Sequence, residues 1–176
     1  MRAVRPIFLA FALVLAVPLS GCTAQPGPQA WAASVCTALS PWRSEIDSLT
    51  SRTQQQMTAK TTPRQAKENL ARLFDGAASA SEAARAGVER AGVPDVTNGD
   101  EIAHGFIGSL AGIRDAYGNA RTGIQALATA PAKAFYDEVG KVVERLTADY
   151  EKSSLDTTKL ESVELRQAFD SLPECK

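Results

Sequence analysis

Apolar residues recur every three or four positions along most of the chain after residue 30, which is the spacing of one face of an α-helix. Four long stripes of this kind run over residues 31–49, 66–91, 102–127 and 135–150. A shorter segment at 160–172 has the same spacing, and no useful length of chain alternates apolar and polar residues as a strand does. The pattern therefore predicts an all-α protein: an antiparallel four-helix bundle with a short extra C-terminal helix.

Proline and its neighbours mark where some of these helices begin. A helix is predicted to begin after Thr62, the threonine cap. Pro63 occupies its first turn, and Gln65 follows three residues after the cap. Pro41 interrupts the first stripe. Either the helix bends at this proline, or Ser40 caps a new helix.

The first 21 residues follow a different pattern. Arg2 and Arg5 precede a continuous apolar stretch at Ile7–Val17. This stretch is too short for a bilayer-spanning helix, which needs about 20 residues. It has the length and the positive flank of the apolar region of a secretory signal peptide.

The leader ends in Leu19-Ser20-Gly21-Cys22, an aliphatic residue and two small residues before a cysteine. This segment resembles the lipobox of bacterial lipoproteins. The resemblance implies cleavage between Gly21 and Cys22 and a diacylglyceryl group on the Cys22 sulfur. The alternative is an ordinary cleaved leader that ends beside this cysteine by chance.

Three segments are expected on this basis: a signal peptide at 1–21, a lipidated cysteine with a flexible tether at 22–30, and a helical bundle domain at 31–176. Two prolines and a glycine in the tether disfavour a helix there. The expected location is the cell membrane, with the domain on its extracytoplasmic face and the lipid as its anchor.

Cys36 and Cys175 remain as a pair once Cys22 carries lipid. An even pair of cysteines in an oxidising compartment predicts a disulfide, which would tie the C-terminal tail to the first helix. Two independent thiols are the alternative.

The overall layout also resembles small helical lipoproteins of actinobacteria. The matching features are the lipobox and, at the two ends of the domain, Cys36, Trp42, Ala168, Phe169, Pro173 and Cys175. Most proteins of that family have no assigned activity, so the resemblance implies no mechanism.

Charge and composition argue against nucleic-acid binding, metal binding and catalysis. The chain has 19 basic and 20 acidic residues, and no basic patch is expected, so nucleic acid is not an expected partner. His104 follows Glu101 at the spacing found twice in di-iron bundles, but it is the single histidine of the chain. We interpret this pair as the exposed start of a helix. We expect no catalytic residues, no metal site and no cofactor.

The sequence thus favours a non-enzymatic interaction module, anchored to the membrane, that binds an unknown envelope protein. The alternative is a binding protein for an apolar small molecule or lipid between the helices. Gly105, Gly108 and Gly112 are interpreted as contacts with the alanine-rich second helix, and the alternative is a flat or pliable helix surface that admits a partner or ligand. Trp31 and Trp42 are expected in the core, with the membrane interface as the alternative for Trp31.

Overall fold

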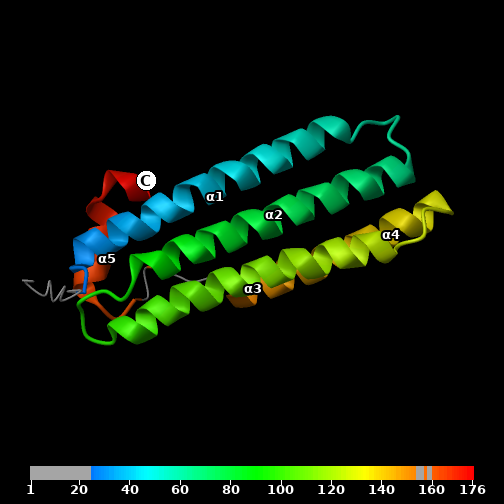
Figure 1. The fold of residues 1–176 in the computed structure, drawn as a ribbon. Helices are drawn as coiled ribbons and strands as arrows, with labels where there is room; N and C mark the ends of the chain where they lie inside the picture. The colour runs from blue at the N-terminus through cyan, green and yellow to red at the C-terminus, as the bar shows by residue number, and fades with distance from the viewer. Residues whose placement is uncertain (1–24, 154–156, 158–159) are drawn as a thin grey trace, which may run out of the picture.

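The computed structural model describes residues 25–153, 157 and 160–176. In this part of the chain five α-helices and a C-terminal 3-10 turn account for the regular structure (Figure 1). They are α1 (Pro28–Gln56), α2 (Pro63–Ala91), α3 (Gly99–Ala126), α4 (Ala132–Ser153), α5 (Val163–Ser171) and the 3-10 turn η2 (Pro173–Cys175). The prediction of four long helices followed by a short fifth is confirmed.

The four long helices run antiparallel in chain order, with α1 packed on α2, α2 on α3, and α3 on α4 (Figure 1). The short α5 and η2 pack against α1 near its start. A helix of 29 residues is about 43 Å long, so the bundle is an elongated rod. One end, here called the α5 end, holds the start of α1 and the α2–α3 connection. The other, called the Lys60 end, holds the α1–α2 and α3–α4 connections.

Trp31 organises the core at the α5 end. Its side chain is fully buried, and its indole Nε1 donates a hydrogen bond to the Gly92 carbonyl oxygen at 2.8 Å. The ring packs edge-on against Phe106 and Phe169, with centroid distances of 5.2 and 6.1 Å. Trp31 is therefore a core residue, and its buried ring does not face a membrane interface. Trp42, also expected in the core, is only partly buried beside the same cluster. A second cluster around Phe74 fills the space between α2, α3 and α4 towards the Lys60 end.

The first helix is longer than expected at both ends. It begins at Pro28, so residues 28–30 of the expected tether are helical. A proline is compatible with a first helical turn because no backbone N–H is needed there. The helix then continues through Pro41 to Gln56 as a single element, so no new helix begins after Ser40.

Two local predictions agree with the structure. Thr62 and Gln65 form a reciprocal capping box at the start of α2. A disulfide joins Cys36 in α1 to Cys175 in η2, with an S–S distance of 2.04 Å. This crosslink fixes the C-terminal turn against the first helix.

The interpretation of Gly108 and Gly112 as contacts with the second helix was wrong. A Cβ atom added at Gly112 would lie 2.4 Å from Ser153 Oγ, and one at Gly123 would lie 3.1 Å from Val142 Cγ2. Both neighbours belong to α4 rather than α2. Gly108 meets no described atom within 4 Å. Gly112 and Gly123 therefore allow α4 to approach α3 closely.

Candidate functional site

A groove of about 570 Å³ follows the contact between α1 and α2. Most of its lining is small or apolar, and its rim is polar. The small and apolar residues are Ala38, Pro41, Trp42, Ala80, Ala83, Ala84 and Gly87, and the rim residues are Ser34, Thr37, Glu45 and Arg90. We call it the Trp42 groove. The four rim residues are exposed, so the groove is open to solvent.

The close approach of α1 to α2 explains why small residues line the floor of the groove. A Cβ atom at Gly87 would lie 2.6 Å from the Cβ atom of Ala38, which is closer than two carbon atoms can pack. Only glycine fits at this crossing. The alanines on either side of it leave a floor without long side chains.

Trp42 forms a wall of the groove, and its orientation is fixed by a hydrogen bond. The indole Nε1 donates to Ser81 Oγ at 3.0 Å, and Ser81 is fully buried in α2. The Ser81 hydroxyl in turn donates to the Ala77 carbonyl oxygen at 2.8 Å. The Trp42 side chain is therefore held in place while part of its ring stays accessible.

The two charged rim residues differ in their contacts. Glu45 accepts a hydrogen bond from Arg52 at 3.1 Å, and this exposed ion pair is only a weak constraint. Arg90 has no ion-pair partner among the described residues. An incoming anionic group can reach the Arg90 guanidinium without displacing a carboxylate.

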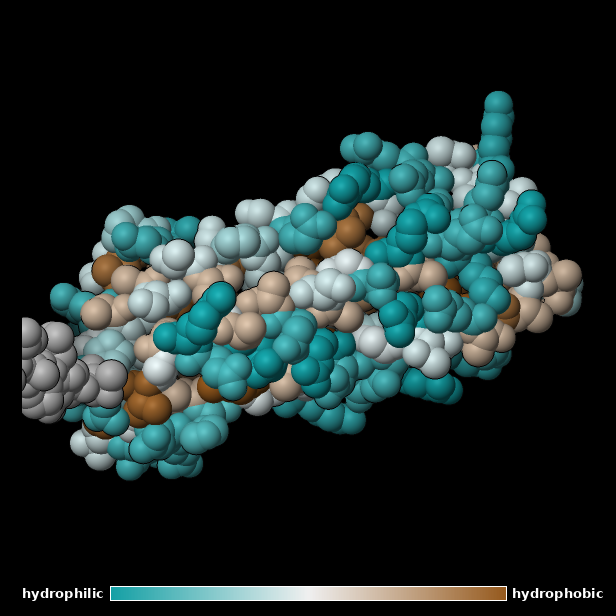
Figure 2. Space-filling view, in the orientation of Figure 1, coloured by the Kyte–Doolittle hydropathy of each residue, from teal (hydrophilic) through white to brown (hydrophobic). Residues whose placement is uncertain are grey.

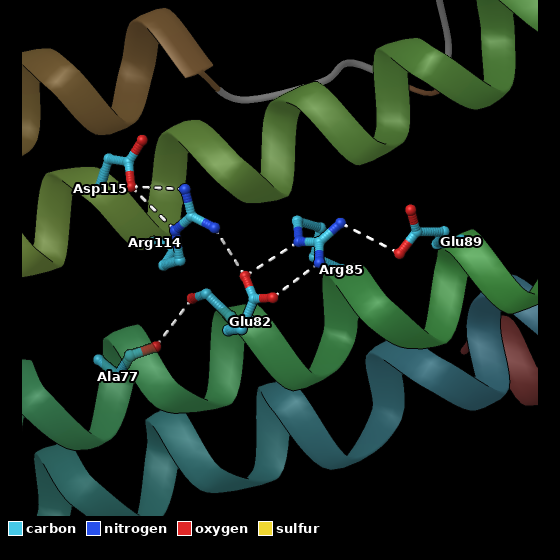
Figure 3. A network of polar contacts seen from close by, with 7 residues as sticks. Ala77, Glu82, Arg85, Glu89, Arg114 and Asp115 are labelled. Carbon is cyan, nitrogen blue, oxygen red and sulfur yellow. Dashed lines mark hydrogen bonds and ion pairs between the residues drawn. The ribbon is translucent and has the colours of Figure 1, made fainter.

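A network of ion pairs joins α2 to α3 (Figure 3). Glu82 accepts hydrogen bonds from Arg85 at 2.7 Å and from Arg114 at 2.8 Å, and these two residues also bind Glu89 and Asp115. The hydrogen bond from Arg85, followed by that from Arg114, lowers the pKa of Glu82 to about 2. A carboxylate with so low a pKa is a poor general base near neutral pH. The network therefore serves to hold the two helices together.

The Glu101–His104 pair lies on the exposed first turns of α3, as the sequence indicated. His104 Nδ1 lies 2.7 Å from the carbonyl oxygen of Asp100. Within the described residues no three or more His, Cys, Asp or Glu side chains are placed to share a metal ion.

Basic residues are concentrated in one short segment, which the nearly neutral net charge of the whole chain does not reveal. Residues 57–74 hold Lys60, Arg64, Lys67 and Arg72 against a single acidic residue, Glu68. The structure gathers them at the Lys60 end, where Figure 2 shows hydrophilic side chains over the upper part and more hydrophobic ones at the tip. A pocket of about 470 Å³ opens there, and its lining is entirely polar: Gln56, Thr58, Lys60, Thr61, Gln65, Glu68, Asn69 and Arg72. Counting charges in short windows would have revealed this group from the sequence.

Comparison of the chain with protein-family models, with curated proteins and with solved structures finds no match in any of the three. None of the helices described here is long and apolar enough to cross a membrane. Cys22 and the leader lie outside the described residues.

Proposed function

We propose that the chain is an exported lipoprotein, anchored through lipid on Cys22 at the extracytoplasmic face of the cell membrane. Its helical domain is a non-enzymatic module that binds an envelope protein at the Trp42 groove.

The leader and the disulfide support export. The apolar stretch at Ile7–Val17 and the lipobox-like ending at Cys22 have the order and spacing of a lipoprotein signal. A structural disulfide such as Cys36–Cys175 is typical of proteins outside the reducing cytosol. The helix that starts at Pro28 leaves only a short link to Cys22, with an extended reach of about 20 Å. The domain would thus stay close to the membrane surface.

The single observation that carries the binding role is the composition of the Trp42 groove. Protein interfaces have an apolar centre, often with an aromatic anchor, and a polar rim. The groove has an alanine and glycine floor, an orientation-fixed Trp42, and exposed polar residues around it. A partner segment that fits would insert a large apolar side chain beside Trp42 and place an acidic residue against Arg90.

Site-specific photocrosslinking in producing cells tests this role. We would place p-benzoylphenylalanine at Thr37 on the groove rim and, as a control, at Glu144 on the exposed face of α4. We expect a discrete crosslinked protein from Thr37 only. Ala83→Arg fills the groove from an exposed position and should abolish this product, whereas Ala148→Arg on α4 should leave it unchanged. Equal products from both probe positions, or insensitivity to Ala83→Arg, would contradict the proposal.

A second candidate is a binding protein for an apolar small molecule, which the size of the groove favours. A volume of about 570 Å³ lies within the range of small-molecule sites. Such sites usually enclose most of their ligand, whereas this groove is open to solvent, so the protein partner fits better. Native mass spectrometry of the membrane-extracted chain separates the two: an adduct of a few hundred daltons that Ala83→Arg removes would favour the small molecule.

A further inference from the structure

Charge is distributed unevenly along the rod. At the Lys60 end, residues 57–74 hold four basic residues and one acidic residue. At the α5 end, residues 89–101 and 161–174 each hold four acidic residues and one basic residue. The dipoles of the long helices largely cancel, because two helix N-termini and two C-termini meet at the Lys60 end. Side chains therefore determine the positive potential there.

The basic residues of the segment 57–74 differ from most others in the described chain because they have no carboxylate partner. Outside this segment, ion pairs engage Arg52, Arg85, Arg114, Arg121, Lys133, Lys141 and Lys152. Lys60 and Arg64 are exposed and make no side-chain hydrogen bond or ion pair with any described residue. Lys67 Nζ donates to the Leu127 carbonyl oxygen at 2.7 Å. The positive charge of residues 57–74 is therefore not neutralised by ion pairs within the described chain.

The polar pocket at this end has the donors that an anion needs. The Arg72 guanidinium donates to Asn69 Oδ1, and Asn69 is itself almost fully buried, so the guanidinium is held at the pocket. Lys60 and the hydroxyl of Thr58 line the same pocket. An ammonium and a guanidinium together suit the oxygens of a phosphate group. Glu68 is the one acidic residue that lines the pocket. It lowers the net positive charge of the lining, which Lys60 and Arg72 still keep positive.

We propose that the Lys60 end binds a linear polymer of phosphate or phosphodiester groups. The basic residues from Arg64 to Arg72 extend over about 12 Å of α2, which suits repeated charges better than one small anion. The pocket lining has no apolar side chain, unlike the centre of a protein interface. A protein partner is therefore less well matched here than at the Trp42 groove.

The orientation of the Lys60 end relative to the membrane rests on the proposed function. The binding of a phosphate polymer at this end does not. With Cys22 anchored, the α5 end lies nearest the membrane and the Lys60 end lies about 43 Å further out along the rod. The acidic α5 end is repelled by an anionic membrane surface, which keeps the rod from turning over. The basic end is thus presented to envelope polymers rather than to the bilayer that holds the lipid.

Binding of fluorescently labelled linear inorganic polyphosphate tests the inference, with the full chain in a neutral detergent and with fluorescence anisotropy measured over a range of salt. The double variant Lys60→Gln, Arg64→Gln removes two cations whose side chains make no ion pair or hydrogen bond with the described residues. Arg43→Gln with Arg145→Gln removes two exposed cations elsewhere and is the matched control. We expect saturable binding that weakens with salt, a loss of about tenfold in affinity for the first pair, and less than twofold for the control. The slope of log affinity against log salt should also fall by about two for the first pair.

Three outcomes would overturn the inference: no binding at low salt, an equal loss in both variants, or equally tight binding of inorganic phosphate alone. A fourth is binding of vesicles of an anionic phospholipid but not of polyphosphate, which would indicate a membrane contact instead. Because the assay uses neither the Trp42 groove nor the Cys22 lipid, these results are independent of the crosslinking at Thr37.

Discussion

The substitution Gly87→Ala tests whether α1 and α2 are in close contact beside the Trp42 groove. Gly87→Ala places a methyl group 2.6 Å from the Ala38 Cβ atom, about 1 Å closer than favourable carbon contacts. Ala38 has no side-chain torsion that could move this atom away. The two helices must therefore separate, or the local backbone must shift.

The magnitude follows from two opposing effects. Alanine is favoured over glycine in a helix interior by about 1 kcal/mol. Overpacking of a close contact costs about 1–3 kcal/mol. The first effect is shared by Gly140→Ala in α4, where an added Cβ meets nothing within 4 Å. The difference between the two variants therefore isolates the contact, and we expect Gly87→Ala to be less stable than Gly140→Ala by about 1–3 kcal/mol.

Urea unfolding followed by circular dichroism measures both variants against the parent chain. In thermal unfolding of a domain of this size, the expected difference in stability between the two variants corresponds to a difference of about 2–12 °C in Tm. Gly140→Ala should unfold at a higher urea concentration than the parent. If Gly87→Ala stabilised the protein as much as Gly140→Ala does, α1 and α2 would not be in close contact at this crossing, and the argument for the shape of the groove floor would be wrong.

Further predictions concern the crosslink, the ion network and the tryptophan. Replacing Cys36 and Cys175 with alanine should lower the free energy of unfolding by about 2–5 kcal/mol, because the bond spans 139 residues; equal urea midpoints for variant and parent would contradict this. Because the folded-state pKa of Glu82, about 2, is below its ordinary value, its stabilising effect is complete above about pH 5 and is lost as the pH falls from 4.5 towards 2. The difference in Tm between the parent and Glu82→Gln should accordingly shrink over that interval, and a pH-independent difference would refute the assignment. Trp42→Phe removes the hydrogen bond to Ser81 and should cost about 1 kcal/mol in urea unfolding, whereas an unchanged midpoint would show that this bond contributes no stability.

Local patterns in the sequence were enough to predict the helices and some of their starts. The capping box at Thr62 involves residues only three apart, so its chemistry can be read without knowing the fold. The end of α1 at Gln56 was missed because its last two turns are mostly polar and exposed, and such turns carry little apolar periodicity. Pro41 was ambiguous because a proline is compatible with a single helix as well as with a helix start.

Features that depend on which helices meet could not be predicted in the same way. The sequence shows that Gly112 is small but not that Ser153 of α4 lies against it. Likewise, the bond from Trp42 to Ser81 joins residues 39 positions apart, and it exists only once α1 has packed on α2. The Trp42 groove depends on the same packing. The basic group near Lys60 is different, because it was present in the sequence and was obscured only by averaging charge over the whole chain.

The proposed binding of an envelope protein at the Trp42 groove presupposes the proposed lipid anchor on Cys22, and the most direct measurement of this anchor is the intact mass of the chain extracted from membranes of producing cells. We expect a chain that begins at Cys22, carries the mass of a diacylglyceryl group, and is two hydrogens lighter because of the Cys36–Cys175 bond. A chain that retains its leader in the cytosol, or one that begins elsewhere and carries no lipid, would contradict the account.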